Sequence, residues 1–169
     1  MEKLKEKFLK IVKEKPLGID ISSIKLEDLK DEIKKNPDYK DKLLKFSEIF
    51  KQMEGHKQWI SQFYVEKKDE IHFFKESIFY NELVQIQIFF EFINHLNVEE
   101  NNCPNLYQII SIRNQLRLNK IRNSIAHFDW SIKGDKITFH DNNFEQSFNY
   151  IEVSEFSSMI GIIAIYLTF

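Results

Sequence analysis

A long run of apolar residues at helical spacing occupies the middle of the chain. Between Trp59 and Leu96 such residues recur every three or four positions, as one face of an α-helix requires. They are Phe73, Phe74, Ile78, Phe79, Leu83, Ile86, Phe90 and Ile93. Only 4 Gly and 3 Pro interrupt the 169 residues, which favours long helices over sheets. The sequence therefore predicts a mainly α protein whose central packing element is one helix or two within this run.

Three further helices are predicted before this run. Residues 2–15 carry an apolar stripe, and Pro16 and Gly18 then break the pattern. Residues 26–35 begin with acids, and residues 36–38 (Asn-Pro-Asp) form a helix start that we extend to about Glu54. Gly55 is predicted to end that helix. We therefore divide the chain into an N-terminal helical extension, residues 1–55, packed on a helical bundle of residues 56–169.

The second half of the chain changes its pattern near residue 128. A helix is predicted from about Asn105 to Phe128, opened by Pro104. Residues 128–132 and 136–140 alternate apolar and polar side chains around a Gly134-Asp135 turn, which predicts a β-hairpin. A final helix is predicted from about Val153 to Leu167. The expected fold class is thus mainly α, a helical bundle with a small β-hairpin after the helix that ends near residue 128.

The cysteine content and the two ends of the chain suggest a compartment. Cys103 stands alone, so it has no partner for an internal disulfide, and it lacks the partners of a zinc site. Residues 1–7 are too charged for a secretory signal. The apolar residues 156–169 number about 14, fewer than the about 20 that span a bilayer. We expect a cytoplasmic protein with no membrane contact and a buried or interface helix at its end, although a longer natural chain would reopen the possibility of a membrane anchor.

Positive charge gathers in one segment, although the chain as a whole carries a net charge of −2. From residue 104 to residue 136 there are six basic residues and only two acids, Asp129 and Asp135. The basic residues are Arg113, Arg117, Lys120, Arg122, Lys133 and Lys136. Arginine is preferred where a phosphate is held by two donors at once. An anionic ligand would therefore bind in this segment rather than over the whole surface.

Residues 122–127, here called the Arg–His motif, read Arg-Asn-Ser-Ile-Ala-His. At about 100° per residue, four apolar side chains share one face and predict a core stripe. They are Leu118, Ile121, Ile125 and Phe128. Arg122 and His127 lie on opposite edges of a second stripe, about 7.5 Å apart along the axis, with the small Ala126 between them. A second copy packed antiparallel about a two-fold axis would bring its histidine near this arginine, so one chain carries half of a site.

The motif and its setting resemble the HEPN superfamily, the higher eukaryotes and prokaryotes nucleotide-binding domains. That family has Arg-x(4–6)-His late in a long helix, and its ribonuclease members typically have Asn after the Arg and Ala before the His, as Asn123 and Ala126 stand here. A hairpin and a closing helix after the motif are similar to those of standalone bacterial members of toxin and abortive-infection systems. The resemblance covers roughly residues 59–169.

The resemblance implies a homodimer, joined through the helix that carries the motif, that cuts RNA without a metal ion or cofactor. The ribose 2′-OH would attack the adjacent phosphate, leaving a 2′,3′-cyclic phosphate and a 5′-OH. His127 would act as general base or acid, Arg122 would stabilise the transition state, and Asn123 would orient the phosphate or the histidine. The expected role is the toxin or effector of a bacterial anti-phage or toxin–antitoxin system, with an antitoxin or regulatory protein as a further partner.

Further residues are assigned to RNA binding or to support of the site. The expected RNA contacts are Arg113, Arg117, Lys120, Trp130 and Lys133. Related toxins have a modifiable Tyr two residues after the His, but Asp129 stands there in this chain. Family members also often carry an acid on an earlier helix, and the candidates are Glu76, Glu82 and Glu91.

Other polar residues have simpler interpretations. The pair His140-Asp141 is interpreted as a solvated hairpin end rather than a catalytic pair. His56, His72 and His95 lack metal-ligand spacing. Two alternatives to a ribonuclease stay open: a non-catalytic HEPN module that binds RNA or a protein, and a structural helical protein whose Arg–His motif is accidental.

Overall fold

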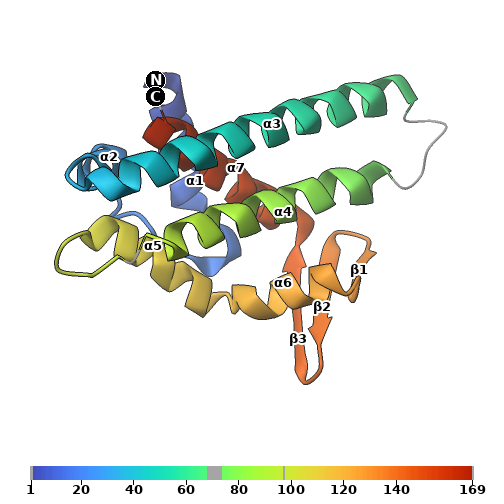
Figure 1. Ribbon diagram of the computed structural model, residues 1–169. Coiled ribbons are helices and arrows are strands. Elements are labelled where there is room, and N and C mark those ends of the chain that lie inside the picture. The colour runs from blue at the N-terminus through green and yellow to red at the C-terminus, as the bar shows by residue number, and fades with distance from the viewer. Residues whose placement is uncertain (1, 68–73, 97, 169) are drawn as a thin grey trace.

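The fold is a helical bundle with a small antiparallel sheet at one end (Figure 1). The computed structural model describes residues 2–67, 74–96 and 98–168. The helices are α1 (Glu2–Glu14), the short 3-10 turn η1 (Pro16–Gly18), α2 (Leu26–Lys34), α3 (Pro37–Lys67), α4 (Phe74–Asn94), α5 (Pro104–Gln115), α6 (Leu118–Ala126) and α7 (Tyr150–Thr168). The strands are β1 (Trp130–Lys133), β2 (Lys136–Asp141) and β3 (Phe144–Asn149). The prediction of a mainly α fold is confirmed.

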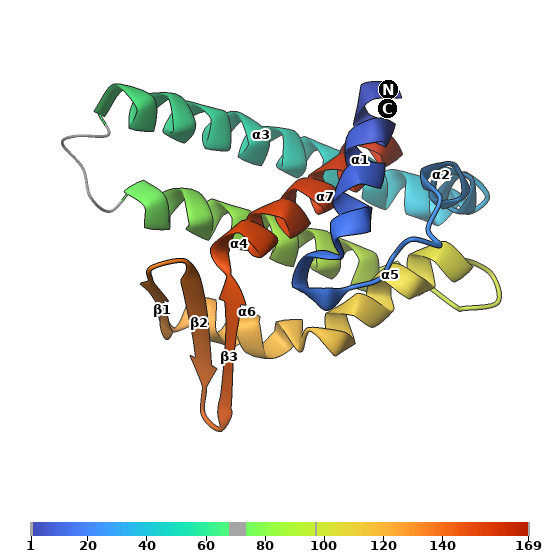
Figure 2. The same cartoon turned by 180° about the vertical axis from the view of Figure 1, so that it is seen from behind.

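Two long antiparallel helices and one buried helix make the frame of the bundle. α3 and α4 lie side by side, and α7 runs behind them (Figures 1 and 2). α7 contacts α1, α2, α3 and α4, so the end of the chain packs against most of its first half. Seen from behind, α1 crosses the outer side of α7 (Figure 2).

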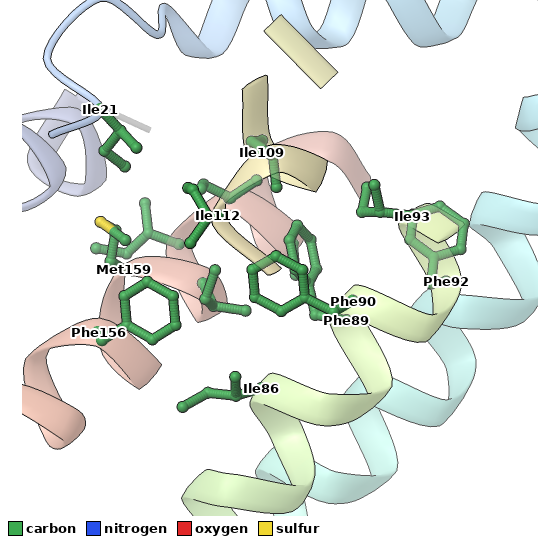
Figure 3. Close-up of a cluster of buried hydrophobic side chains, with 14 of the residues drawn as sticks. Ile21, Ile86, Phe89, Phe90, Phe92, Ile93, Ile109, Ile112, Phe156 and Met159 are labelled. Carbon is green, nitrogen blue, oxygen red and sulfur yellow. The ribbon is translucent and has the colours of Figure 1, made fainter. Parts of the chain in front are cut away.

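The core is rich in phenylalanine, as the composition suggests. Phe89 and Ile93 of α4, Ile109 of α5 and Phe156 of α7 are fully buried, and they meet between these helices (Figure 3). The rings of Phe90 and Phe156 are nearly parallel, with centroids 6.3 Å apart. Burying a side chain of this size stabilises the fold by roughly 1.5–3 kcal/mol relative to exposure. The helical spacing therefore identified the buried positions Leu83, Ile86, Phe90 and Ile93 of α4. Phe73 and the side chains of Phe74, Ile78 and Phe79 lie outside what the structure describes.

α3 is longer than predicted, because Gly55 does not end it. The helix continues for three more turns to Lys67, so the expected helix end near residue 54 is wrong. A glycine inside a helix costs only about 1 kcal/mol relative to alanine, which the packing of α3 on α4 can offset. The boundary between residues 55 and 56 thus has no helix end to mark it, and the division of the chain there stays a prediction.

A buried glutamate joins the N-terminal segment to the helix that leads to the motif. Glu32 of α2 accepts hydrogen bonds from the backbone N–H groups of Asn105 and Leu106, at 3.0 and 2.9 Å. These donors are at the first turn of α5, where an α-helix has no partners of its own and carries partial positive charge. Glu32 therefore caps α5 from another helix, and residues 26–34 help to fix the approach to the motif.

The helix predicted from Asn105 to Phe128 is two helices. The backbone turns at Arg117, whose φ of 49° lies in the left-handed region, and this break separates α5 from α6. Neither Gly nor Pro marks the position, so the sequence carried no local signal. The break lets Leu116 turn into the core, where it is 3% exposed, while α6 changes direction and packs on β2.

The predicted hairpin is present and is extended by a third strand. β1 and β2 pair antiparallel with Ile132 opposite Ile137, and Gly134 takes a left-handed φ in the turn. β3 then pairs with β2, and this strand was not predicted. Asn142 supplies the second left-handed turn position, a role that Asn fills more readily than most residues. Because of β3, the end of β2 leads into a second hairpin turn, across which Asp141 pairs with Phe144.

α7 is longer than the 14 apolar residues suggested. Its segment Tyr150–Leu167 has a mean hydropathy of 1.4 over 18 residues, which by length and composition alone would suffice to cross a membrane. The estimate from sequence was short because the helix starts at Tyr150, directly after β3. Of this segment 61% is buried inside the structure, and Phe156, Ile160 and Ala164 are fully buried. α7 is therefore a core helix of this fold, as the prediction of a buried helix implied.

Candidate active site

α6 holds the Arg–His motif against the sheet through a buried serine. Ser124 is 1% exposed, and its hydroxyl lies 2.6 Å from the carbonyl oxygen of His140 and 3.0 Å from that of Lys120. Two backbone bonds add to this link, from Asp129 N to Ser124 O (2.7 Å) and from His140 N to Asp129 O (2.9 Å). A hydroxyl inside the motif thus fastens α6 to β2 and fixes the positions of its exposed neighbours.

Arg122 lies on the side of α6 that faces α4. Its Nη1 is 3.3 Å from Oε1 of Glu91, and both side chains are about two-fifths exposed, at 44% and 39%. An ion pair this open to water contributes only about 0.2–1 kcal/mol, so it orients the guanidinium without locking it. A phosphate can therefore displace the carboxylate at small cost.

Of the three acids among which the sequence left the choice open, Glu91 contacts Arg122. Glu82 is buried and accepts a hydrogen bond from Ser154 of α7, away from the motif. The side chain of Glu76 lies outside what the structure describes. Of the two described candidates, Glu91 is the one that contacts the motif.

Asn123 lies on the other side of α6 and contacts Asp141 of β2. The Asn123 amide nitrogen donates to Oδ2 of Asp141 at 3.2 Å, and Nζ of Lys120 lies 3.1 Å from the same oxygen. The hydrogen bond from Lys120, followed by that from Asn123, holds the pKa of Asp141 below its ordinary value of 3.8. A charged carboxylate only accepts hydrogen bonds, so the amide of Asn123 has its nitrogen toward Asp141.

Asp141 corrects the interpretation of His140-Asp141 as a solvated hairpin end. The Asp141 side chain is only 11% exposed, because β3 and α6 flank the end of β2. The side chain of His140 has a different contact: its Nδ1 lies 3.3 Å from Oε2 of Glu145, a side chain that is 71% exposed. Alternation along a strand separates the two neighbours, and only Asp141 joins the site. The missing third strand is why sequence reasoning overlooked it.

His127 caps the C-terminal end of α6 and is exposed. Its backbone N–H donates to Asn123 O at 3.0 Å, and its φ and ψ of −96° and 4° lie in the sparsely populated bridge region where many active-site residues are found. Within the described residues, no hydrogen bond or ion pair joins Arg122 to His127. Two adjacent residues of the motif are held by different elements, Arg122 by α4 and Asn123 by β2.

The predicted core stripe of α6 is correct except at its last member. Ile121 and Ile125 are buried, and Leu118 is half-buried. Phe128 is 76% exposed, so its assignment to the core is wrong. The helix ends at Ala126, and the backbone of Phe128 turns into the left-handed region instead of continuing the stripe.

Comparison with known proteins adds nothing to this geometry. No family model, no curated protein and no solved structure matches the chain. The residues of the site and the resemblance of the Arg–His motif are what indicate a function.

The five residues predicted to contact RNA have different surroundings. Arg113 donates to Asn94 of α4 at 2.7 Å, and Lys120 pairs with Asp141. Arg117, at the start of α6, and Lys133, beside the β1–β2 turn, are exposed. Trp130 is half-buried and packs against the hydrophobic core, which leaves less of its ring for an RNA base than the prediction assumed.

A polar cleft adjoins the motif on the Asn123 side. It has a volume of about 390 Å³ between the start of α6 and the β2–β3 turn. Its lining includes Arg117, Asn119, Lys120, Asp141 and Asn142. Separately, the described residues contain no group of three or more His, Cys, Asp or Glu side chains arranged to hold a metal ion, and His72 lies outside them.

The contacts of Asp141 predict a positioning role that can be measured. If the site cuts RNA, replacing Asp141 by Asn should lower the cleavage rate by up to about 100-fold, because Lys120 loses its counter-charge and the Asn123 amide loses a fixed acceptor. The low pKa keeps this carboxylate charged at neutral pH, so in the wild type its contribution should disappear only as the pH falls through that lowered pKa. The matched control is Glu145→Gln, which neutralises an exposed acid of the same sheet. Equal rates for the two variants would exclude the role.

Proposed function

We propose that the protein is a metal-independent endoribonuclease whose active site is completed by a second copy of the chain. The observation that carries this proposal is the exposure of Arg122 on α6 and of His127 at its C-terminal cap, with Glu91 paired to Arg122 and Asp141 bonded to Asn123. These residue types, in a mainly α fold and in the order that the HEPN resemblance implies, can perform RNA cleavage by transesterification.

The proposed reaction uses the substrate's own nucleophile. The ribose 2′ oxygen attacks the adjacent phosphorus, and the bond from phosphorus to the 5′ oxygen of the next nucleotide breaks. The imidazole of His127 accepts the 2′ proton or donates a proton to the leaving 5′ oxygen, and water exchanges the other proton. The guanidinium of Arg122 stabilises the additional negative charge on the phosphoryl oxygens in the transition state. The products are a 2′,3′-cyclic phosphate and a 5′-OH.

We propose two chains because the side chains around the motif are directed to different elements. Arg122 is directed to α4, whereas Asn123 and Lys120 are directed to β2. His127 is five residues from Arg122, about 140° around the helix and about 7.5 Å along it. Ala126 is exposed and small, so a second α6 can approach closely there. An antiparallel pair about a two-fold axis would then place the histidine of one copy beside the arginine of the other.

A non-catalytic RNA-binding or protein-binding module is the second candidate. One observation favours it: Arg113, Lys120 and Arg122 already have partners within the chain. The carboxylates paired with Lys120 and Arg122 lower the net positive potential that a phosphate would meet, and Asn94 occupies a donor of Arg113. The role of a toxin or effector in bacterial defence rests on the resemblance alone and is proposed only together with the nuclease.

An RNase assay with end-group analysis separates these functions. Purified protein is incubated with a long single-stranded RNA in the presence of EDTA, and the new 3′ ends are tested for a 2′,3′-cyclic phosphate. The proposal expects cleavage that EDTA does not stop and ends that a 5′ kinase labels directly. Binding without cleavage would leave the non-catalytic module, and ends with a 3′-OH would contradict the proposed chemistry.

A further inference from the structure

Phe128, directly after the motif histidine, is an aromatic ring held in solvent. It is 76% exposed, the largest exposed fraction among the large apolar side chains of the described residues. The others are Leu9, Leu44, Ile49, Trp59, Tyr107 and Ile151, and none of them lies on α6 or on the sheet. Exposure of a ring forfeits the stabilisation that burial would give, so the position calls for a reason other than stability.

The backbone at this position is also in a conformation that phenylalanine disfavours. The hydrogen bonds from Phe128 N to Ile125 O and from Asp129 N to Ser124 O form a Schellman turn, with Phe128 at its left-handed residue. Its φ is 56°, a conformation usually filled by glycine and uncommon for a bulky side chain. Strain of this kind concentrates at functional sites.

Backbone hydrogen bonds hold Phe128 and the residue after it in place. Phe128 N donates to Ile125 O at 3.1 Å, and the flanking Asp129 is bonded both to Ser124 of α6 and to His140 of β2. The buried Ser124 hydroxyl adds a further bond between these elements. The backbone that carries the ring is thus held within one residue of His127, so only the two side-chain torsions of Phe128 have to be ordered when a flat ligand stacks on it.

The surroundings of Phe128 fit one flat base better than a protein interface. Its chain neighbours Ala126, His127 and Asp129 are exposed, and only Ala126 among them is apolar. The centre of a protein interface is an extended apolar patch with few charges. An isolated ring beside polar groups is the arrangement with which proteins stack unpaired RNA bases.

We propose that Phe128 is a stacking platform for the base next to the cleaved phosphate, and that the substrate is therefore single-stranded or unpaired RNA. This inference rests on the proposed ribonuclease function. Bases in a duplex already stack on one another and offer no free face, so paired RNA cannot use the platform. Trp130 was predicted to contact RNA, but it is half-buried. We assign the aromatic contact with RNA to Phe128 instead.

Binding of a non-cleavable RNA measures the platform. The probe is a single-stranded 2′-O-methyl oligoribonucleotide, which lacks the nucleophile, and its affinity is measured by fluorescence anisotropy. Loss of one base–aromatic stack should weaken binding about 5- to 150-fold in Phe128→Leu, whereas Phe128→Trp should bind within about twofold of wild type. The control is Tyr107→Leu, which removes a partly exposed ring on α5 and should leave the affinity unchanged.

Phe128→Gly separates a binding defect from a folding defect. Glycine relieves the left-handed strain and removes few contacts, so this variant should melt at or above the wild-type temperature while it binds as weakly as Phe128→Leu. Leucine or glycine variants that bind RNA normally would overturn the platform. A change confined to the dimer fraction in sedimentation would also overturn it and assign Phe128 to contact between copies.

The outcome also distinguishes the platform from the proposed function. A wild type that cleaves RNA and a Phe128→Leu variant that binds normally would remove the platform and keep the nuclease. A wild type that binds the probe through Phe128 but never cleaves RNA would remove the nuclease and keep the platform. A wild type that binds no RNA overturns both.

Discussion

Replacing His127 by alanine is expected to lower the rate of RNA cleavage by at least about 100-fold, because general acid–base catalysis typically contributes 10²–10⁴-fold. The side chain is exposed at the end of α6, and the hydrogen bond that holds the residue there is from its backbone N–H to Asn123 O. The free energy of unfolding should therefore change by less than about 0.5 kcal/mol. Cleavage rates at saturating RNA and thermal melting measure the two expectations.

The control for this variant is His95→Ala. His95 is exposed at the end of α4 and is not part of the Arg–His motif. Its removal should leave the cleavage rate within about twofold of wild type. A folded His127→Ala protein that cuts RNA as fast as His95→Ala would remove the histidine from the chemistry and leave the binding module as the better account.

Replacing Arg122 by lysine is expected to damage cleavage almost as much as replacing it by alanine. Lysine keeps the positive charge and can still pair with Glu91, but it lacks the planar fork that binds two phosphoryl oxygens at once. Removing one donor to a transition-state oxyanion typically costs about 10²–10³-fold in rate. We expect a loss of that size for both variants, with similar melting temperatures.

Lys45→Gln is the matched charge control, since it removes one positive charge from an exposed position on α3. Its cleavage rate should be unchanged. A lysine at position 122 that restored most of the activity would show that charge alone is needed and would contradict the bidentate role.

The parts of the fold that follow from local periodicity were predicted, and the parts that follow from turns between elements were not. The buried faces of α1 and α4 repeat every three or four residues, so these helices and their core positions could be predicted from the sequence, as could Ile121 and Ile125 of α6. The break at Arg117 and the turn at Phe128 place bulky side chains in left-handed positions that usually require Gly or Asn. Tertiary packing imposes these two turns, and no Gly, Asn or Pro at either position predicts them from the sequence.

The same limit explains which site residues were found. Arg122, Asn123 and His127 belong to a short local pattern, and the structure places the first two on α6 and His127 at its C-terminal cap. Glu91 and Asp141 come to the motif from other elements, 31 residues before Arg122 and 18 residues after Asn123. Only the packing of α6 on α4 and β2 identifies them, because the sequence does not show which of its helices and strands come into contact.

The central claim is that one chain carries half of a site, and mixing two inactive variants tests it most directly. Arg122→Ala and His127→Ala proteins are unfolded together, refolded together and assayed on RNA beside each variant alone. Random pairing makes half of the dimers mixed, and each mixed dimer keeps one intact arginine–histidine site of two, so the mixture should recover about a quarter of the wild-type activity. A mixture as inactive as its two components, with mixed dimers shown by mass spectrometry, would contradict the account.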